Sequence, residues 1–226
     1  MTTSTFFPDA DIETNTVDGV TIRGGVTDIW ADLRAGAGTS AADAAADDRI
    51  THLNMNAASQ WTKMSRGVFT FNTGPTIGDS DSIDSSTLGL VATERVQGIG
   101  GQSIRLVIFV TPPASETALA SGDHVATRWG TAEQATDRTL AGLTVNSVDY
   151  NDWTLNATGL TNISKTGITK FGFRFVSDAD NADPGGTGDR DSLGGVAMAE
   201  EILAGDKRPK LTVTHTPVFI PKAMVF

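Results

Sequence analysis

Alternation of apolar and polar residues at every second position is the feature that most constrains the fold of this chain. Residues 209–217 read Pro-Lys-Leu-Thr-Val-Thr-His-Thr-Pro, so apolar Leu211 and Val213 are separated by polar residues between two prolines. Period two is typical of a β-strand with one buried face, and the prolines exclude a helix. The same reasoning predicts strands over three further ranges, 63–71, 86–92 and 170–176.

A nearly continuous apolar run, residues 104–110, predicts a central strand that is buried on both faces and stopped by Pro112 and Pro113. The 24 glycines and the clusters of Ser, Thr, Asn and Asp between the runs supply turns, including one long loop over 177–195. Short helices are expected over only three ranges, 115–120, 133–137 and 157–163. The pattern therefore predicts an all-β protein, an antiparallel jelly-roll β-sandwich with a few short helices.

The domain organisation follows from the absence of internal repeats and linkers in the sequence. Residues 17–216 are expected to form a single jelly-roll domain, with an N-terminal docking segment over 1–16 and an apolar C-terminal docking tail over 217–226. Apolar residues at chain ends are typical of surfaces that bind a partner. The predicted partner-docking residues are Phe6, Phe7, Val218, Phe219, Ile220, Val225 and Phe226.

The composition excludes several classes of protein. There are 17 Lys and Arg against 27 Asp and Glu, for a formal net charge of −10, so the chain lacks the clustered cations that neutralise nucleic-acid phosphates. No apolar run approaches the length that spans a bilayer, and the first residues do not resemble a secretion signal. With no cysteine, disulfides, thiol nucleophiles and cysteine-ligated zinc are excluded.

An acidic, glycine-rich loop over 178–192 is the most unusual segment of the sequence. Carboxylate and carbonyl oxygens in such a loop are the ligands that Ca²⁺ prefers, although the EF-hand spacing is absent. An exposed acidic turn is the alternative interpretation, because Asp and Gly are also common turn residues. If calcium is bound as a cofactor, the predicted ligands are Asp178, Asp180, Asp183, Asp189 and Asp191.

Aromatic residues among polar neighbours suggest a second kind of contact. Sugar-binding sandwiches stack aromatic rings on sugar faces and bind hydroxyls with Asn, Asp and Arg. By this pattern Trp129, Tyr150 and Trp153 are the predicted glycan-contact residues. The alternative is that the two tryptophans pack into the core, as large aromatic residues mostly do.

No motif in the sequence predicts a catalytic residue. The glycines of Gly36-Ala37-Gly38 lack the preceding buried strand that a dinucleotide site requires, and Gly78-Asp79-Ser80 is typical of a turn. The three histidines show no ligand spacing and are expected in solvent, with His215 pointing outward from its strand. A hydrolase with a pair of carboxylates stays open, because the sequence does not give the separation of carboxylates.

Five blocks in fixed order carry a family resemblance: residues 66–71, 83–90, 150–160, 167–174 and 208–214. The series resembles the jelly-roll modules of the DNRLRE type and related proteins encoded in tailed-phage structural gene regions, over about residues 60 to 216. The family's signature hexapeptide is absent, Ser86 stands where alanine is usual, and His215 stands where an aromatic residue is common.

The resemblance implies a non-catalytic sandwich used for virion architecture, surface attachment or carbohydrate contact. We therefore expect a structural protein of a phage virion, such as a capsid decoration, head-fibre or tail-associated subunit, assembled in the host bacterial cytoplasm. Its expected partners are other virion subunits and further copies of itself, with host glycans as an additional contact and no nucleic acid. The alternative is a carbohydrate-binding module of a bacterial surface or exported system.

Overall fold

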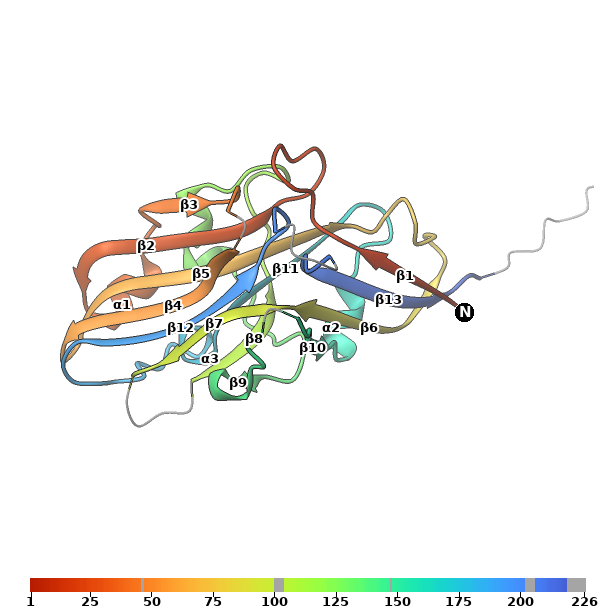
Figure 1. Cartoon of the computed structure of the whole chain (residues 1–226). Helices are drawn as coiled ribbons and strands as arrows, with labels where there is room; N and C mark the ends of the chain where they lie inside the picture. Colours follow the sequence, from red (N-terminus) through yellow and green to blue (C-terminus); the bar gives the residue numbers. More distant parts are fainter. Residues whose placement is uncertain (46, 100–103, 147, 202–205, 219–226) are drawn as a thin grey trace, which may run out of the picture.

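The computed structural model describes residues 1–45, 47–99, 104–146, 148–201 and 206–218, and Figure 1 shows their arrangement. Two antiparallel sheets, one of four and one of nine strands, pack against each other. The predicted all-β sandwich with a few short helices is confirmed. Within the described ranges, no helix has the length and apolar character needed to cross a membrane.

The smaller sheet contains both ends of the described chain. Its strands follow the order β1-β13-β6-β10, with bounds Thr2–Phe6, Lys210–Thr216, Ser82–Leu90 and Asn151–Thr154. The β1 strand lies in the segment that the sequence suggested for docking, but it is an integral edge strand. Its Thr2 lies opposite His215 of β13, so the first and last described strands lie side by side at one end of the sandwich.

The larger sheet is organised around β5, the longest strand. Its main path is β7-β12-β4-β5-β11-β8-β9, with bounds Ala92–Gln97, Arg190–Ala197, Asp47–Ala57, Gln60–Asn72, Ile168–Phe175, Arg105–Val110 and Arg138–Thr139. The β2 strand, Asp18–Asp28, pairs with β5 and with the short β3, Ser40–Ala42. The first half of β5 pairs with β4 and the second half with β11.

Helices are short and lie in the connections. They are α1 Trp30–Ala35, α2 Ala157–Thr161 and α3 Val176–Ala179, with 3₁₀ turns η1 Ser121–His124, η2 Ala126–Arg128 and η3 Leu140–Gly142. The helix expected over 157–163 is confirmed in α2, where the Asn156 side chain caps the first turn by accepting the Gly159 N–H.

The other two predicted helices, over 115–120 and 133–137, are wrong. Asp123 accepts the N–H groups of Ala114 and Ala120, which holds the first segment as a loop. In the second, the Gln134 N–H donates to Ile108 of β8, so this segment runs alongside the sheet. Tertiary hydrogen bonds outweigh local helix propensity in both segments.

The core between the sheets is built by the alternation of β11. Phe171, Phe173 and Phe175 are buried on the face toward the smaller sheet. The Phe173 ring meets Trp153 of β10 edge-on at a centroid distance of 4.8 Å, and this contact joins the two sheets. The predicted common face of the three phenylalanines is therefore the main core.

The opposite face of the larger sheet is also buried. Val107 and Phe109 of β8 contribute to a second apolar cluster with Val68, Trp129 and Val176. Their neighbours Leu106 and Ile108 face the main core, so β8 is buried on both faces as its apolar run predicted. The loop expected over 177–195, in contrast, contains the start of β12, whose Ser192 and Gly194 pair with β7 and β4.

Candidate binding site at the terminal end of the sandwich

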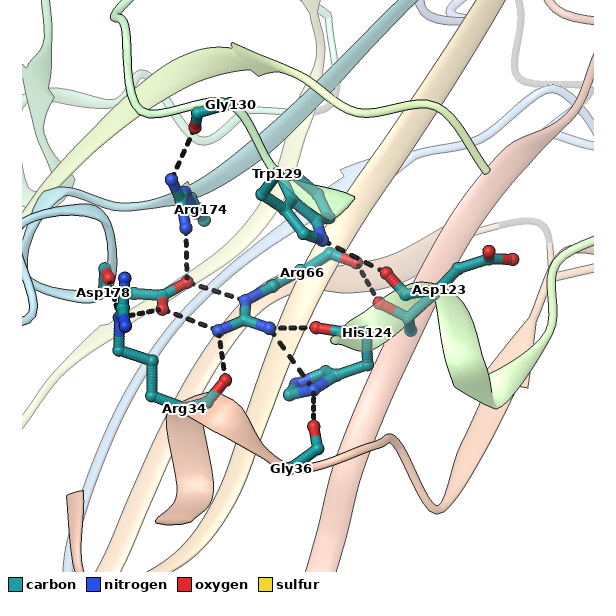
Figure 2. Close-up of polar contacts among 10 residues, drawn as sticks. Arg34, Gly36, Arg66, Asp123, His124, Trp129, Gly130, Arg174 and Asp178 are labelled. Atoms are coloured by element: carbon teal, nitrogen blue, oxygen red, sulfur yellow. Dashed lines mark hydrogen bonds and ion pairs between the residues drawn. The ribbon is translucent and has the colours of Figure 1, made fainter. Parts of the chain in front are cut away.

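A buried ionic cluster occupies the covered face of the larger sheet (Figure 2). Asp178 is 1% exposed and accepts two parallel hydrogen bonds from Arg66, from Nη2 at 2.6 Å and from Nε at 2.7 Å. The remaining donors of the Arg66 guanidinium point to His124 and to the Arg34 carbonyl. Each nitrogen of this fully buried guanidinium thus has an acceptor, in the Asp178 carboxylate, the His124 carbonyl or the Arg34 carbonyl, which is the condition for burying it.

Two more arginines surround the same carboxylate. Arg34 Nε lies 3.5 Å from Asp178 Oδ1, and Arg174 Nη1 lies 3.9 Å from Oδ2. Although burial raises the pKa of the Asp178 carboxyl, the three arginines hold it below its ordinary value. Burial lowers the pKa of Arg174 to about 10, and its guanidinium stacks on the Phe109 ring at 4.4 Å.

His124 completes the cluster as a neutral group. Burial and the adjacent Arg66 charge lower the pKa of His124 to about 4. The cluster thus joins β5, β11, α1 and α3, which supply Arg66, Arg174, Arg34 and Asp178 (Figure 2). We assign it a role in fixing the layers of the fold, because Arg66 and Asp178 are engaged with each other and with the groups around them, although Arg174 Nε and Nη1 and His124 Nε2 have no hydrogen-bond partner among the described residues.

A second buried charge lies where residues 13–18 meet the segment after β12. Asp18 is fully buried, and its Oδ2 accepts the Ala199 N–H at 2.9 Å. Asp18 Oδ1, Glu13 Oε1 and Glu200 Oε2 are buried without a hydrogen-bond partner among the described residues. Burial, reinforced by the negative charge of Glu200, raises the pKa of Asp18 well above its ordinary value.

Asp18→Asn should raise the free energy of unfolding at pH 7 by about 1–3 kcal/mol, because it removes a poorly compensated buried carboxyl and keeps an acceptor for Ala199. A raised pKa stabilises the fold below the unfolded-state pKa, and this stabilisation is lost as pH rises through the folded-state pKa. In urea denaturation, the gain should therefore shrink between pH 7 and pH 5. The exposed Asp79→Asn is the control, and an equal gain at both pH values would contradict the explanation.

The predicted calcium ligands are not assembled in the structure. Asp178 belongs to the arginine cluster, and Asp191 contacts the buried His52. Asp180, Asp183 and Asp189 are exposed. Across the described ranges, no three His, Asp or Glu side chains are grouped so that they could hold a metal ion.

Two of the three predicted glycan contacts are inaccessible. Trp129 and Trp153 are 4% and 3% exposed, so neither ring face is free to stack on a sugar. Trp153 packs on Phe173, and the Trp129 indole N–H donates to the Asp123 carbonyl. Tyr150 is partly exposed, but the Lys210 ammonium lies 3.6 Å from its ring centroid. The alternative interpretation of the tryptophans, as core residues, is correct.

The predicted docking residues lie in different environments. Phe6 is buried in the main core, because β1 pairs with β13 and turns this side chain inward, so it is not available to a partner. Phe7 is half-buried beneath the Arg208 guanidinium. Val218 is 51% exposed, just after β13. The remaining four predicted residues, Phe219, Ile220, Val225 and Phe226, lie outside the described residues.

All three histidines are buried, so their predicted exposure is wrong. His215 shares the inward face of β13 with Leu211 and Val213, because residues two apart on a strand face the same side. The outward orientation expected for it is corrected by this register. The burial of His52 between β4 and β12, and of His124 beneath the arginine cluster, depends on partners distant in sequence.

We call the end of the sandwich where β1 and β13 pair the terminal end. A hydrogen-bonded series of three side chains lies there and was not predicted from the sequence. His215 Nδ1 donates to Asp81 Oδ2 at 2.7 Å, and Ser4 Oγ lies 3.2 Å from His215 Nε2. The hydrogen bond from His215 is the main cause that lowers the pKa of Asp81. This serine–histidine–aspartate order ties β1, β13 and the turn before β6 together. It is also the order of a nucleophile, its base and the group that orients the base.

A surface hollow of about 340 Å³ lies beside this series. It is lined by Ile83, Leu160, Thr161, Ile163 and Lys165. Ile83 lies opposite His215 in the sheet, and the Lys165 ammonium donates to the Asp81 carbonyl at 2.6 Å. The terminal end thus combines the first and last described strands with a partly apolar hollow that Lys165 borders.

No protein-family model matches the chain, and no curated protein matches it in sequence.

Proposed function

We propose that this chain is a non-enzymatic structural subunit of a tailed-phage virion, such as a capsid decoration, head-fibre or tail-associated protein. The proposal starts from the resemblance of residues 60–216 to DNRLRE-type modules of phage structural gene regions. The observation that carries it is the placement of both terminal strands at one end of the sandwich, with Val218 exposed where the chain leaves β13. A subunit held by its ends presents the opposite end of the sandwich outward.

Electron microscopy of particles from the phage or host that encodes this chain tests the proposal. We expect the sandwich at fixed, symmetrically repeated positions, with its terminal end against neighbouring subunits and the opposite end in solvent. Recovery of the chain only as a free protein, absent from purified particles, would contradict it. The alternative, a carbohydrate-binding module, is favoured by no observation, because Trp129 and Trp153 are buried.

A second candidate function, hydrolysis of an ester, is favoured by one specific observation, the series Ser4–His215–Asp81. In that reaction His215 Nε2 takes the Ser4 hydroxyl proton while Ser4 Oγ attacks the acyl carbon, and the proton then passes to the leaving alcohol. Water, deprotonated by His215, then attacks the acyl-serine, and the acid leaves as Ser4 Oγ regains its proton. We rank this function second because Asp81 also accepts the Gly78 N–H at 3.1 Å, so the series has a structural role in fastening the turn.

A fluorophosphonate probe distinguishes the two functions, because it labels a serine only when a base activates it. If the chain is a hydrolase, the probe should label Ser4, and the label should be lost in Ser4→Ala and weakened in Asp81→Asn. Ser85→Ala, which changes an exposed serine of β6, is the control and should be labelled like the wild type. A folded wild-type chain that stays unlabelled would eliminate the hydrolase.

A further inference from the structure

The hollow at the terminal end is a shallow site with one polar and one apolar part. Ile83 of β6 and Leu160 of α2 belong to the edge of the main core and are only partly buried. Ile163 continues the same apolar wall, and Lys165 lies beside it. A volume of about 340 Å³ accommodates one or two large apolar side chains.

The strand register places the end of β13 close to this hollow. Thr216, the last residue of β13, lies opposite Ser82, and Ser82 precedes Ile83 in the wall of the hollow. Residues 219–226 read Phe-Ile-Pro-Lys-Ala-Met-Val-Phe and contain no acidic residue. We call residues 219–226 the tail. Its apolar composition matches the apolar wall of the hollow.

The chain leaves β13 away from its own hollow. The side chains of Pro217 and Val218 are exposed, and the Val218 main-chain N–H donates to the Asp81 carboxylate, so at this point the chain continues along the line of β13 and has not turned back toward Ile83. Ile83 lies opposite His215, two residues before Pro217, so the apolar wall of the hollow lies behind the point at which the chain leaves β13. A neighbouring molecule can present its tail to the hollow without such a reversal. Eight extended residues span at most about 26–29 Å, enough to reach an adjacent subunit.

We propose that the hollow lined by Ile83, Leu160 and Ile163 binds the tail of a second copy of this chain. The inference deepens the proposed structural function and rests on it: it names the partner and the site through which the terminal end is joined. Burial of the tail's apolar side chains supplies the binding free energy, and Lys165 lies where it can bind a main-chain carbonyl of the tail. A reciprocal exchange between two copies closes a symmetric dimer.

Sedimentation of the purified full chain over a range of concentrations tests the exchange. We expect an oligomer whose fraction rises with concentration. Deletion of residues 219–226, and separately Leu160→Glu in the hollow, should each weaken self-association at least about tenfold. Ala157→Glu adds the same charge at an exposed position of α2 outside the hollow, so it should associate like the wild type. Thermal denaturation checks that each variant is folded.

A mixture of the two defective variants shows whether the hollow binds the tail of a second copy or the tail of its own chain. The tail-deleted chain keeps its hollow, and Leu160→Glu keeps its tail, so the mixture should form a heterodimer that neither variant forms alone. A wild-type chain that is monomeric at all concentrations, or an oligomer unaffected by tail deletion, would overturn the exchange. Neither result affects the position of the chain on the particle, which electron microscopy measures. The tail exchange can therefore be contradicted while the proposed structural function stands.

Discussion

Asp178→Ala should lower the free energy of unfolding by about 3–5 kcal/mol, the cost of leaving a buried charge without its partner. The Arg66 guanidinium is fully buried and gives two hydrogen bonds to this carboxylate. Arg34 and Arg174 also face it, so the substitution leaves three positive charges together. Urea denaturation at pH 7 measures the loss.

Asp180→Ala is the matched control for Asp178→Ala, because it removes an exposed carboxylate two residues away. It should change the free energy of unfolding by less than about 0.5 kcal/mol. The double variant Arg66→Met with Asp178→Leu should recover most of the loss, since apolar residues of similar size often replace a buried ion pair at little cost. A loss below about 1 kcal/mol in Asp178→Ala would show that the pair contributes little.

The pH dependence of the same residue gives an independent check. Burial raises the pKa of Asp178, but the arginines outweigh it and hold the pKa below its ordinary value. A lowered pKa stabilises the fold above the unfolded-state pKa, and the contribution is lost as pH falls through the folded-state pKa. Both variants should therefore differ from the wild type most near neutral pH and least in acid, but with opposite signs, because Asp178→Ala loses a stabilising carboxylate and Asp18→Asn removes a destabilising one.

The strands that could be predicted from the sequence are those in which the pattern of apolar and polar residues itself shows which positions are buried. The apolar run of β8 and the alternation in β5, β6, β11 and β13 identify these strands without reference to the rest of the chain. In β12, Gly194 and Gly195 interrupt the alternation, and an acidic loop precedes it, so the sequence suggests turns there. Pairing with β4 and β7 on both sides stabilises β12, and those partners are distant in sequence.

The arginine cluster and the terminal end could not be predicted for a related reason. Alternation places Arg66 and Arg174 on the face opposite Phe69 and Phe173, and in a two-layer sandwich that face is expected in solvent. Here α1, η1 and α3 cover it, and Asp178 comes from 112 residues beyond Arg66. The inward direction of His215 could be predicted, because His215 lies two and four residues from Val213 and Leu211 on the same strand. Its partners Ser4 and Asp81 could not be predicted, because they are distant in sequence.

Phe173→Ala should lower the free energy of unfolding by about 3–5 kcal/mol, because it opens a cavity where the two sheets meet. The Phe173 ring is fully buried and makes edge contacts with Trp153 at 4.8 Å and with Phe69 at 5.9 Å. Phe173→Leu fills most of that space and should cost less than about 1.5 kcal/mol. Denaturation in urea measures both variants, and losses of equal size would argue against the cavity. Because Trp153 belongs to the same sheet as β1 and β13, weakening this contact should also loosen the terminal end, and self-association through the tail should fall with it.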